Sequence, residues 1–223
     1  MIFLSGLVGI LLVLTAEARV GNSSESSLCT ETEECLLFNP ICENDYFEAR
    51  HYQSSKWVTI EETSFIMEIA ATRAFKQLFE YINGGNDQGK KIAMTSPVLM
   101  KVPEETRFLG MCVYSMSFLL PSIHQKNPPI PTNSKVHIHE MPEMKVYVES
   151  YDGWMMSISD KFNAHELRSA LDAEGAMYER DYHYAVCYNS PMKMLNRHNE
   201  VWYIAKGEPE CSSSEELEFS LFD

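Results

Sequence analysis

Histidine and methionine side chains near strand ends are the residues of this sequence best suited to binding chemistry. His51 lies in the stretch ARHYQSSKW, where the alternation of a strand puts it on the same face as Phe47 and Ala49. A neutral imidazole on such an apolar face can coordinate iron. The residues alone favour the other interpretation, a core histidine that is hydrogen-bonded to a carbonyl group, and leave the iron ligand as the alternative.

Methionine is abundant, with 13 residues in a chain of 223. Its thioether side chain adapts to irregular surfaces and suits a flat apolar ligand, but it also fills ordinary cores. We predict core positions for most of these residues. Six of them lie near the ends of predicted strands: Met94, Met100, Met111, Met116, Met192 and Met194.

A second pair of histidines could hold a metal ion. His137 and His139 are two residues apart on a predicted strand, so their side chains lie on one face. No third ligand is evident nearby in the sequence, which favours a pair of surface histidines. The sequence contains no GxSxG elbow, P-loop, GxGxxG or HExxH motif. We therefore expect a binding protein that is not an enzyme.

The first residues predict a secreted, extracellular protein. The apolar run from Ile2 to Leu14 is too short to span a bilayer comfortably, and Ala16-Glu17-Ala18 matches a cleavage pattern. We predict that residues 1–18 are a signal peptide and that the mature chain has no stable membrane insertion. An uncleaved anchor is the alternative, since no Lys or Arg precedes the apolar run. Asn22 begins an Asn-Ser-Ser sequence and is a candidate N-glycosylation site.

The cysteines fit an oxidising compartment. Their even number makes all of them candidates for disulfide bonds, and six cysteines permit fifteen pairings among which the residues do not choose. The candidates are Cys29, Cys35, Cys42, Cys112, Cys187 and Cys211.

The charge of the chain excludes one class of partner. Removal of residues 1–18 takes away Glu17 and leaves 31 acidic against 18 basic side chains, a net charge of −13. Nucleic acid is therefore not an expected partner, because binding to phosphates needs a positive surface. Acidic membrane surfaces are disfavoured for the same reason.

The chain between residues 45 and 206 shows the patterns of strands and of two helices. Apolar residues recur every four positions from Ser64 to Ile82 and predict a helix. Residues 160–174 predict a second helix with Asp160 as its cap. The predicted strands are residues 46–52, 56–62, 91–101, 111–120, 136–140, 145–154, 183–190 and 200–206.

This order is β-β-α-β-β twice, which predicts an internal pseudo-twofold repeat. Each half also has a strand that ends at Ser-Pro, with Pro97 and Pro191 at corresponding places. The pattern predicts an α+β fold, a distorted antiparallel β-barrel of about eight strands with two helices. Two separate α+β domains are the alternative. Residues 19–44, which are rich in Cys, Ser and Glu, and the acidic residues 207–223 are predicted tails of the domain 45–206.

Five blocks of sequence together resemble the SOUL heme-binding protein family, and most of all its SOUL branch. In chain order they are YFEARHYQSSKWVTI, NGGNDQGKKIAMTSPV, FLLPS followed by PPIPT, VYVESYDGW and YNSPMKMLNRHNEVWYIAKGEP. The resemblance covers about residues 45–208. It implies a distorted barrel of eight or nine strands, and binding of heme or a related tetrapyrrole without catalysis.

The resemblance also implies where heme binds. The histidine of an Arg-His-Tyr segment is an axial iron ligand in the SOUL branch, and that position here is His51. The sister branch holds heme in a shallow apolar groove beside the first helix. Carried over, the groove lies between the helix 64–82 and the loop after Ser190, with apolar contacts from Met192, Met194 and Leu195. Lys193 or Arg197 would meet a propionate group.

The leader, the six cysteines and the acidic tails differ from the intracellular members of that family. We therefore expect an extracellular heme binder that transports, buffers or scavenges heme. The alternative is a protein-interaction module, in which the second helix or the acidic tail binds a protein partner. A general carrier of flat apolar molecules is a third interpretation. The oligomeric state does not follow from the sequence.

Overall fold

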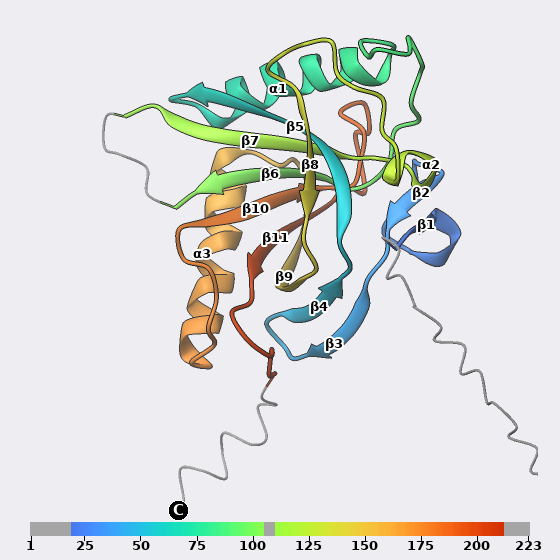
Figure 1. Cartoon of the computed structure of the whole chain (residues 1–223). Coiled ribbons are helices and arrows are strands. Elements are labelled where there is room, and N and C mark those ends of the chain that lie inside the picture. The colour runs from blue at the N-terminus through green and yellow to red at the C-terminus, as the bar shows by residue number, and fades with distance from the viewer. Residues whose placement is uncertain (1–18, 105–109, 212–223) are drawn as a thin grey trace, which may run out of the picture.

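The computed structural model describes residues 19–104 and 110–211, and one curled antiparallel sheet forms most of it (Figure 1). The predicted signal peptide, residues 1–18, and residues 212–223 of the predicted tail lie outside the described residues. Nine strands make up the sheet: β3 (Asn39–Glu43), β4 (Glu48–Tyr52), β5 (Ser55–Ser64), β6 (Val98–Pro103), β7 (Cys112–Leu119), β8 (His137–Met141), β9 (Met144–Asp152), β10 (Tyr182–Cys187) and β11 (His198–Ile204). Their order is β3-β4-β9-β11-β10-β6-β7-β5-β8.

The order of the elements confirms the predicted repeat and the α+β class. The first half is β4, β5, α1 (Met67–Ile82), β6 and β7, and the second is β8, β9, α3 (Ser157–Ala173), β10 and β11. A short helix, α2 (Ser122–Gln125), lies in the proline-rich connection between the halves. The sheet therefore curls into the predicted barrel-like shape with two long helices.

The central strands of the sheet are covered on both faces, whereas β3 and β8 at its edges are largely exposed. α1 lies across β5 and β7, and α3 lies across β9 and β11 (Figure 1). Within β5, Val58 and Ile60 pack under α1, whereas Trp57 points into the half barrel. The interior is aromatic, and the rings of Tyr52 and Trp202 stack there with their centroids 4.7 Å apart. Strands buried on both faces carry nearly continuous apolar runs, which made them recognisable in the sequence.

One predicted equivalence between the halves is wrong. β6 begins after Pro97, so residues 91–97 are an irregular approach to a strand and not a strand that a proline ends. In the second half β10 ends at Cys187, before Pro191. Val98 pairs with Cys187, so the two Ser-Pro sequences lie at the same end of the sheet but on opposite sides of their strands. The repeat is carried by the order of elements and not by this motif.

The N-terminal segment is part of the fold and not a tail. β1 (Val20–Asn22) pairs with β2 (Glu34–Leu36), the 3-10 helix η1 (Ser23–Glu25) follows β1, and β3 joins the large sheet beside β4. Leu36 and Leu37 are buried against the aromatic interior. The apolar stretches of this segment are short and lie among Ser, Glu and Cys residues, so the composition did not reveal that the segment contributes to the core.

Four of the six candidate cysteines form disulfide bonds. Cys29 pairs with Cys35, and Cys42 of β3 pairs with Cys211 at the end of the described chain. Cys112 and Cys187 are free, which corrects their inclusion among the disulfide candidates. Both lie in the sheet, where strand pairing fixes their positions: Cys112 is opposite Ser64 and Cys187 is opposite Val98.

A buried imidazole attaches α3 to the sheet. The ring nitrogens of His183 in β10 lie 2.6 Å from a Glu104 oxygen and 3.0 Å from an Asp160 oxygen. Asp160 was predicted to cap α3, but the helix begins three residues earlier and Asp160 points into the sheet. Burial alone would lower the pKa of His183, and the hydrogen bonds to the two carboxylates overcome this and raise the pKa from 6.5 to about 9.

This contact predicts a pH-dependent stability. A histidine whose pKa is higher in the folded state stabilises the fold fully below the unfolded pKa, and that stabilisation is lost as pH rises through about 9. We expect the wild-type free energy of unfolding to fall by on the order of 3 kcal/mol between pH 6.5 and 9.5, relative to H183Q. Urea unfolding at a series of pH values measures the difference, and parallel curves for the two proteins would contradict it.

Candidate functional site

The loop between β10 and β11 carries the predicted apolar ligand contacts, and the structure exposes them. Met192, Met194 and Leu195 have exposed fractions of 85%, 72% and 77%. Exposed thioether and aliphatic side chains in such a cluster cost free energy in water unless something covers them. The structure therefore leaves the three predicted contacts available to a ligand.

Arg197 holds this loop together through hydrogen bonds to its backbone. Its guanidinium group is buried and donates hydrogen bonds of 2.8 Å to the carbonyl oxygens of Ser190 and Lys193. It also lies over the ring of Trp154, 4.4 Å from the ring centroid. Because these contacts occupy Arg197, its role here is to position the loop. Lys193 is the loop cation nearer to solvent, and its ammonium group lies 3.4 Å from the Thr30 hydroxyl oxygen.

Two segments that contact each other and the loop also carry exposed apolar side chains. Trp154 and Met156 precede α3, and Phe65, Ile66 and Ile69 lie at the start of α1. The contact of Trp154 with Arg197 connects the loop to the start of α3. A hydrogen bond of 2.8 Å from the Ser157 amide to the Glu68 carboxylate connects the start of α3 to that of α1. We call these residues, with Met192, Met194 and Leu195, the apolar strip.

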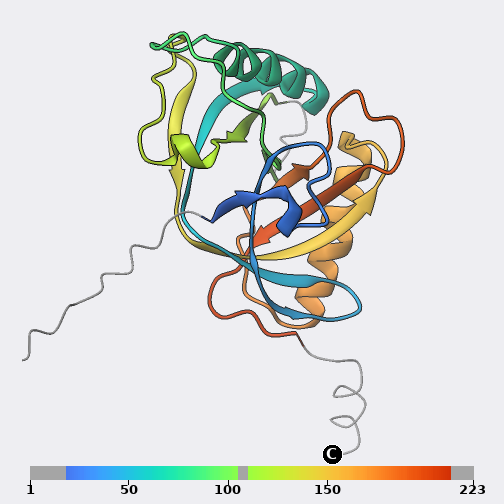
Figure 2. The same cartoon turned by 90° about the vertical axis from the view of Figure 1, so that its right-hand side faces the viewer.

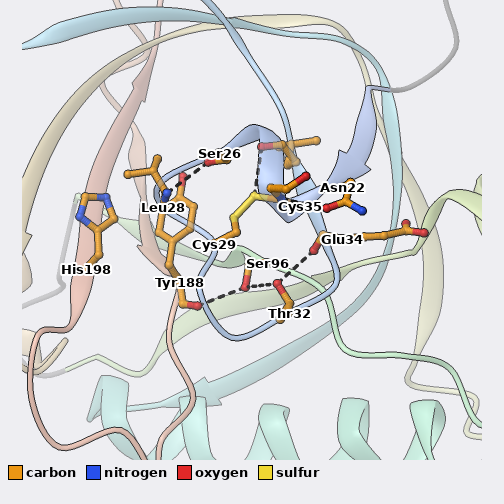
Figure 3. The surroundings of a disulfide bond; sticks show 12 residues. Asn22, Ser26, Leu28, Cys29, Thr32, Glu34, Cys35, Ser96, Tyr188 and His198 are labelled. Atoms are coloured by element: carbon orange, nitrogen blue, oxygen red, sulfur yellow. Dashed lines mark hydrogen bonds between the residues drawn. A yellow bond between two sulfur atoms is a disulfide. The ribbon is translucent and has the colours of Figure 1, made fainter.

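A disulfide-closed segment supports the loop from the other side. Residues 29–35, closed by the Cys29–Cys35 bond, form the disulfide loop shown in Figure 3. The Glu31 carboxylate accepts a hydrogen bond of 2.9 Å from the Ser190 amide. The hydroxyl of Thr32 donates to the Ser96 hydroxyl, which in turn donates to the carbonyl oxygen of Tyr188. The disulfide loop therefore contacts Ser190 directly and Tyr188 through Ser96, and these two residues lead into the loop of Met192.

His51 lies elsewhere. Its face is apolar as predicted, since Phe47 and Ala49 are buried under α3, but its imidazole is 22% exposed and its Nε2 lies 2.7 Å from Glu143 Oε1. His51 is opposite Lys145 in β9, whereas the loop joins β11 opposite Asp152. Seven residues of strand separate these positions, about 23 Å. The structure thus does not bring His51 together with Met192, Lys193, Met194, Leu195 and Arg197.

A buried polar cluster inside the half barrel was not predicted from the sequence. The Glu200 carboxylate, fully buried, lies 3.0 Å from Arg50 Nη1 and accepts hydrogen bonds from Tyr188 and from the Trp202 indole. Burial alone would raise the pKa of Glu200, but His198 and Arg50 hold it below its usual value. Alternation along β4 and β11 could have shown this, because it puts Arg50 and Glu200 beside interior aromatic residues.

His137 and His139 are exposed on β8, an edge strand. In the described ranges 19–104 and 110–211, no three His, Cys, Asp or Glu side chains are grouped so that they could hold a metal ion. The exposure of both side chains agrees with the interpretation of them as surface histidines.

A cleft opens at the other end of the half barrel from the loop. We call it the mouth cleft; it has a volume of about 660 Å³ and is lined by β6, β8, β10, the β8–β9 turn and the end of β11. Its walls mix apolar and aromatic side chains with charged ones. His51 does not line it, although its partner Glu143 does.

Comparisons with known proteins agree on one family. The sequence profile of the family described as "SOUL heme-binding protein" matches residues 33–204. "Heme-binding protein 2" of Homo sapiens is 37% identical over 163 residues, which cover 73% of this chain and 80% of that protein. "Heme-binding protein 1" of Xenopus tropicalis is 31% identical over 159 residues, covering 71% and 83% respectively. The solved EcmrR C-terminal domain has a TM-score of 0.53 at 7% identity, covering 76% of this chain and 98% of that domain, which shows likeness of fold alone.

The support that the disulfide loop gives to Ser190 can be tested. In the C29S/C35S variant we expect the free energy of unfolding to fall by about 2 kcal/mol, because the closed loop no longer restricts the unfolded chain. We also expect the Ser190 amide to exchange hydrogen faster, since Glu31 is no longer held against it. Urea unfolding and hydrogen exchange with mass spectrometry measure the two effects. C42S/C211S serves as the control that loses a disulfide far from this loop, and unchanged exchange at Ser190 in C29S/C35S would contradict the assignment.

Proposed function

The chain belongs to the SOUL heme-binding protein family, and from this membership we propose that it binds heme or a related tetrapyrrole without catalysing a reaction. We propose that the ligand binds at Met192, Met194 and Leu195. The observation behind this choice is that the three side chains are exposed and that their loop contacts Trp154 through Arg197. A porphyrin is a flat apolar ring with anionic propionate groups at one edge. It requires a broad apolar surface with a cation near its border.

The apolar strip offers that surface. Covering half of each of four large apolar side chains contributes on the order of 3–6 kcal/mol. A micromolar dissociation constant corresponds to about 8 kcal/mol, so apolar contact supplies a large part of such an affinity and polar groups the remainder. Lys193 lies on the same loop and can meet a propionate through a charge-assisted hydrogen bond.

The mouth cleft is less suited to this ring. Several of its lining residues are charged, among them Lys101, Glu143, Lys145 and Glu208. A porphyrin face pressed over these groups would remove the water around them, and this loss of hydration costs free energy. The apolar strip is therefore the surface on which we place the ring.

His51 fits an axial ligand poorly in this arrangement. Its Nε2 is engaged by the Glu143 carboxylate, and it lies on the outer face near the opposite end of β9. To coordinate iron it would have to release Glu143, and the heme would then lie away from the apolar strip. His51 thus defines a second, separate heme position, which the titration below distinguishes from the first.

We further propose that the protein acts outside the cell, where it transports, buffers or scavenges heme. The two disulfide bonds support this, because such bonds persist mainly in oxidising compartments. The predicted leader 1–18 and the candidate glycosylation site Asn22 agree with it, and Asn22 is exposed in the structure. In the described part of the chain, no helix has the length and apolar character needed to cross a membrane.

Hemin titration of the protein from a secretory host tests the proposal. We expect a sharpened Soret band in the wild type and a dissociation constant at least tenfold weaker in M192S/M194S, because two thioether contacts are lost. M177S is the matched control, since Met177 is similarly exposed but lies after α3, away from the apolar strip. The absence of hemin binding by the wild type would refute the function itself.

The same titration on H51A locates the iron. With the ring on the apolar strip, we expect the Soret maximum of H51A to coincide with that of the wild type, because the imidazole is about 23 Å from the loop. H51Q, which preserves a polar partner for Glu143, controls for local changes in β4. A shifted maximum in both variants would place the heme at His51 and overturn the assignment to the strip.

A further inference from the structure

We propose that the mouth cleft is a second binding site, for a flat aromatic compound that carries a carboxylate or sulfonate group. This inference goes beyond the proposed heme binding, because the cleft lies at the end of β9 and β11 that is remote from the apolar strip. Lys145 of β9 and Ile204 of β11 line the cleft at this end of the two strands. The loop of Met192 is attached at their other end, where His198 pairs with Asp152. The cleft volume of about 660 Å³ lies in the usual range for small-molecule sites.

The walls of the cleft suit an aromatic ring. The rings of Tyr182 and Tyr184 on β10 meet edge to face with their centroids 5.6 Å apart, and both line the cleft. Met141 and Met144 on either side of the β8–β9 turn are buried, and their thioether groups favour contact with aromatic edges. An aromatic ligand entering here meets rings and sulfur atoms that the fold already holds in place.

One cation in the cleft lacks a carboxylate partner. The Lys101 ammonium group lies over the Tyr182 ring, 3.7 Å from its centroid. Within residues 19–104 and 110–211, no carboxylate lies within ion-pair distance of Lys101. A cation that is held against an aromatic wall in this way favours an anionic ligand, because the ammonium group has three donors and no acceptor.

The other charged side chains that line the cleft already have partners. Lys101 is therefore the group that distinguishes an anionic ligand from a neutral one. Lys145 forms an ion pair with Glu208, and Glu143 pairs with His51. The Lys145–Glu208 pair carries no net charge, and the Glu143 carboxylate is engaged by the His51 imidazole, so Lys101 is left to attract an anionic group. The strand register keeps Lys101 in place, because it is opposite Tyr184 in the pairing of β6 with β10.

Fluorescence titration with 8-anilinonaphthalene-1-sulfonate tests the site on the mature full chain. This probe has a flat aromatic ring system and one sulfonate. We expect saturable binding that weakens roughly tenfold in K101Q, because a charge-assisted contact is lost, and that persists in K101R. Hemin bound to the apolar strip should leave this binding intact, and M192S/M194S should bind the probe at this site as the wild type does.

Two further measurements check that the variant is folded and show where the probe binds. Far-ultraviolet circular dichroism checks that K101Q is folded, and amide shifts in NMR spectra locate the probe; we expect them at Tyr182, Tyr184 and His139. Equal affinities of K101Q and the wild type would overturn the site, as would probe binding that hemin displaces one for one and that M192S/M194S removes. The second result would assign the probe to the apolar strip, and either result would leave the heme proposal standing.

Discussion

The requirement to bury both faces of one curled sheet determines where the other elements of this protein lie. Each half of the repeat supplies one helix for the outer face, so that α1 covers β5 and β7 while α3 covers β9 and β11. Side chains of the strands fill the inner face, and the disulfide loop covers the end near Ser96 and Tyr188 (Figure 2, Figure 3). The apolar strip and the mouth cleft are places where this covering is incomplete.

The same requirement explains the two buried polar clusters. A carboxylate removed from water must be compensated by donors, and breaking such a pair costs more than never forming it. Glu200 meets Arg50, Tyr188 and Trp202 in the interior, and Glu104 meets His183 under α3. These contacts fix β4 to β11 and α3 to β10, and so hold the scaffold that positions the ligand surfaces.

Much of the fold followed from the sequence because its signals are local. The four-residue spacing of Ala70, Ala74 and Leu78 and the apolar runs of the strands reveal elements directly. What remained hidden depends on contacts across long separations. Nothing near Leu36 shows that it enters the core, and nothing near Pro97 shows on which side of it the strand lies. The choice of Cys42 and Cys211 among fifteen pairings likewise needs the folded chain.

Single residues of the candidate site could be predicted from the sequence, but their arrangement in space could not. Met192, Met194 and Leu195 were identified by resemblance, and their exposure agrees with a ligand surface. The separation of His51 from them could not be seen in the sequence, since it depends on the register of β4, β9 and β11. Lys193 or Arg197 was expected to meet a propionate group. The structure shows that the Arg197 guanidinium group donates to carbonyl oxygens of its own loop, a role that short-range sequence patterns do not reveal.

The Cys42–Cys211 bond joins the first strand of the large sheet to the end of the described chain, 169 positions later. Nearly the whole domain is therefore a covalent ring. A protease that cuts one peptide bond between these cysteines opens the ring but releases no fragment, because both products stay attached through the sulfur atoms. In a medium that contains proteases, a singly nicked molecule would keep its strands at high effective concentration and retain its shape. Its pieces would separate only after reduction or a second cut.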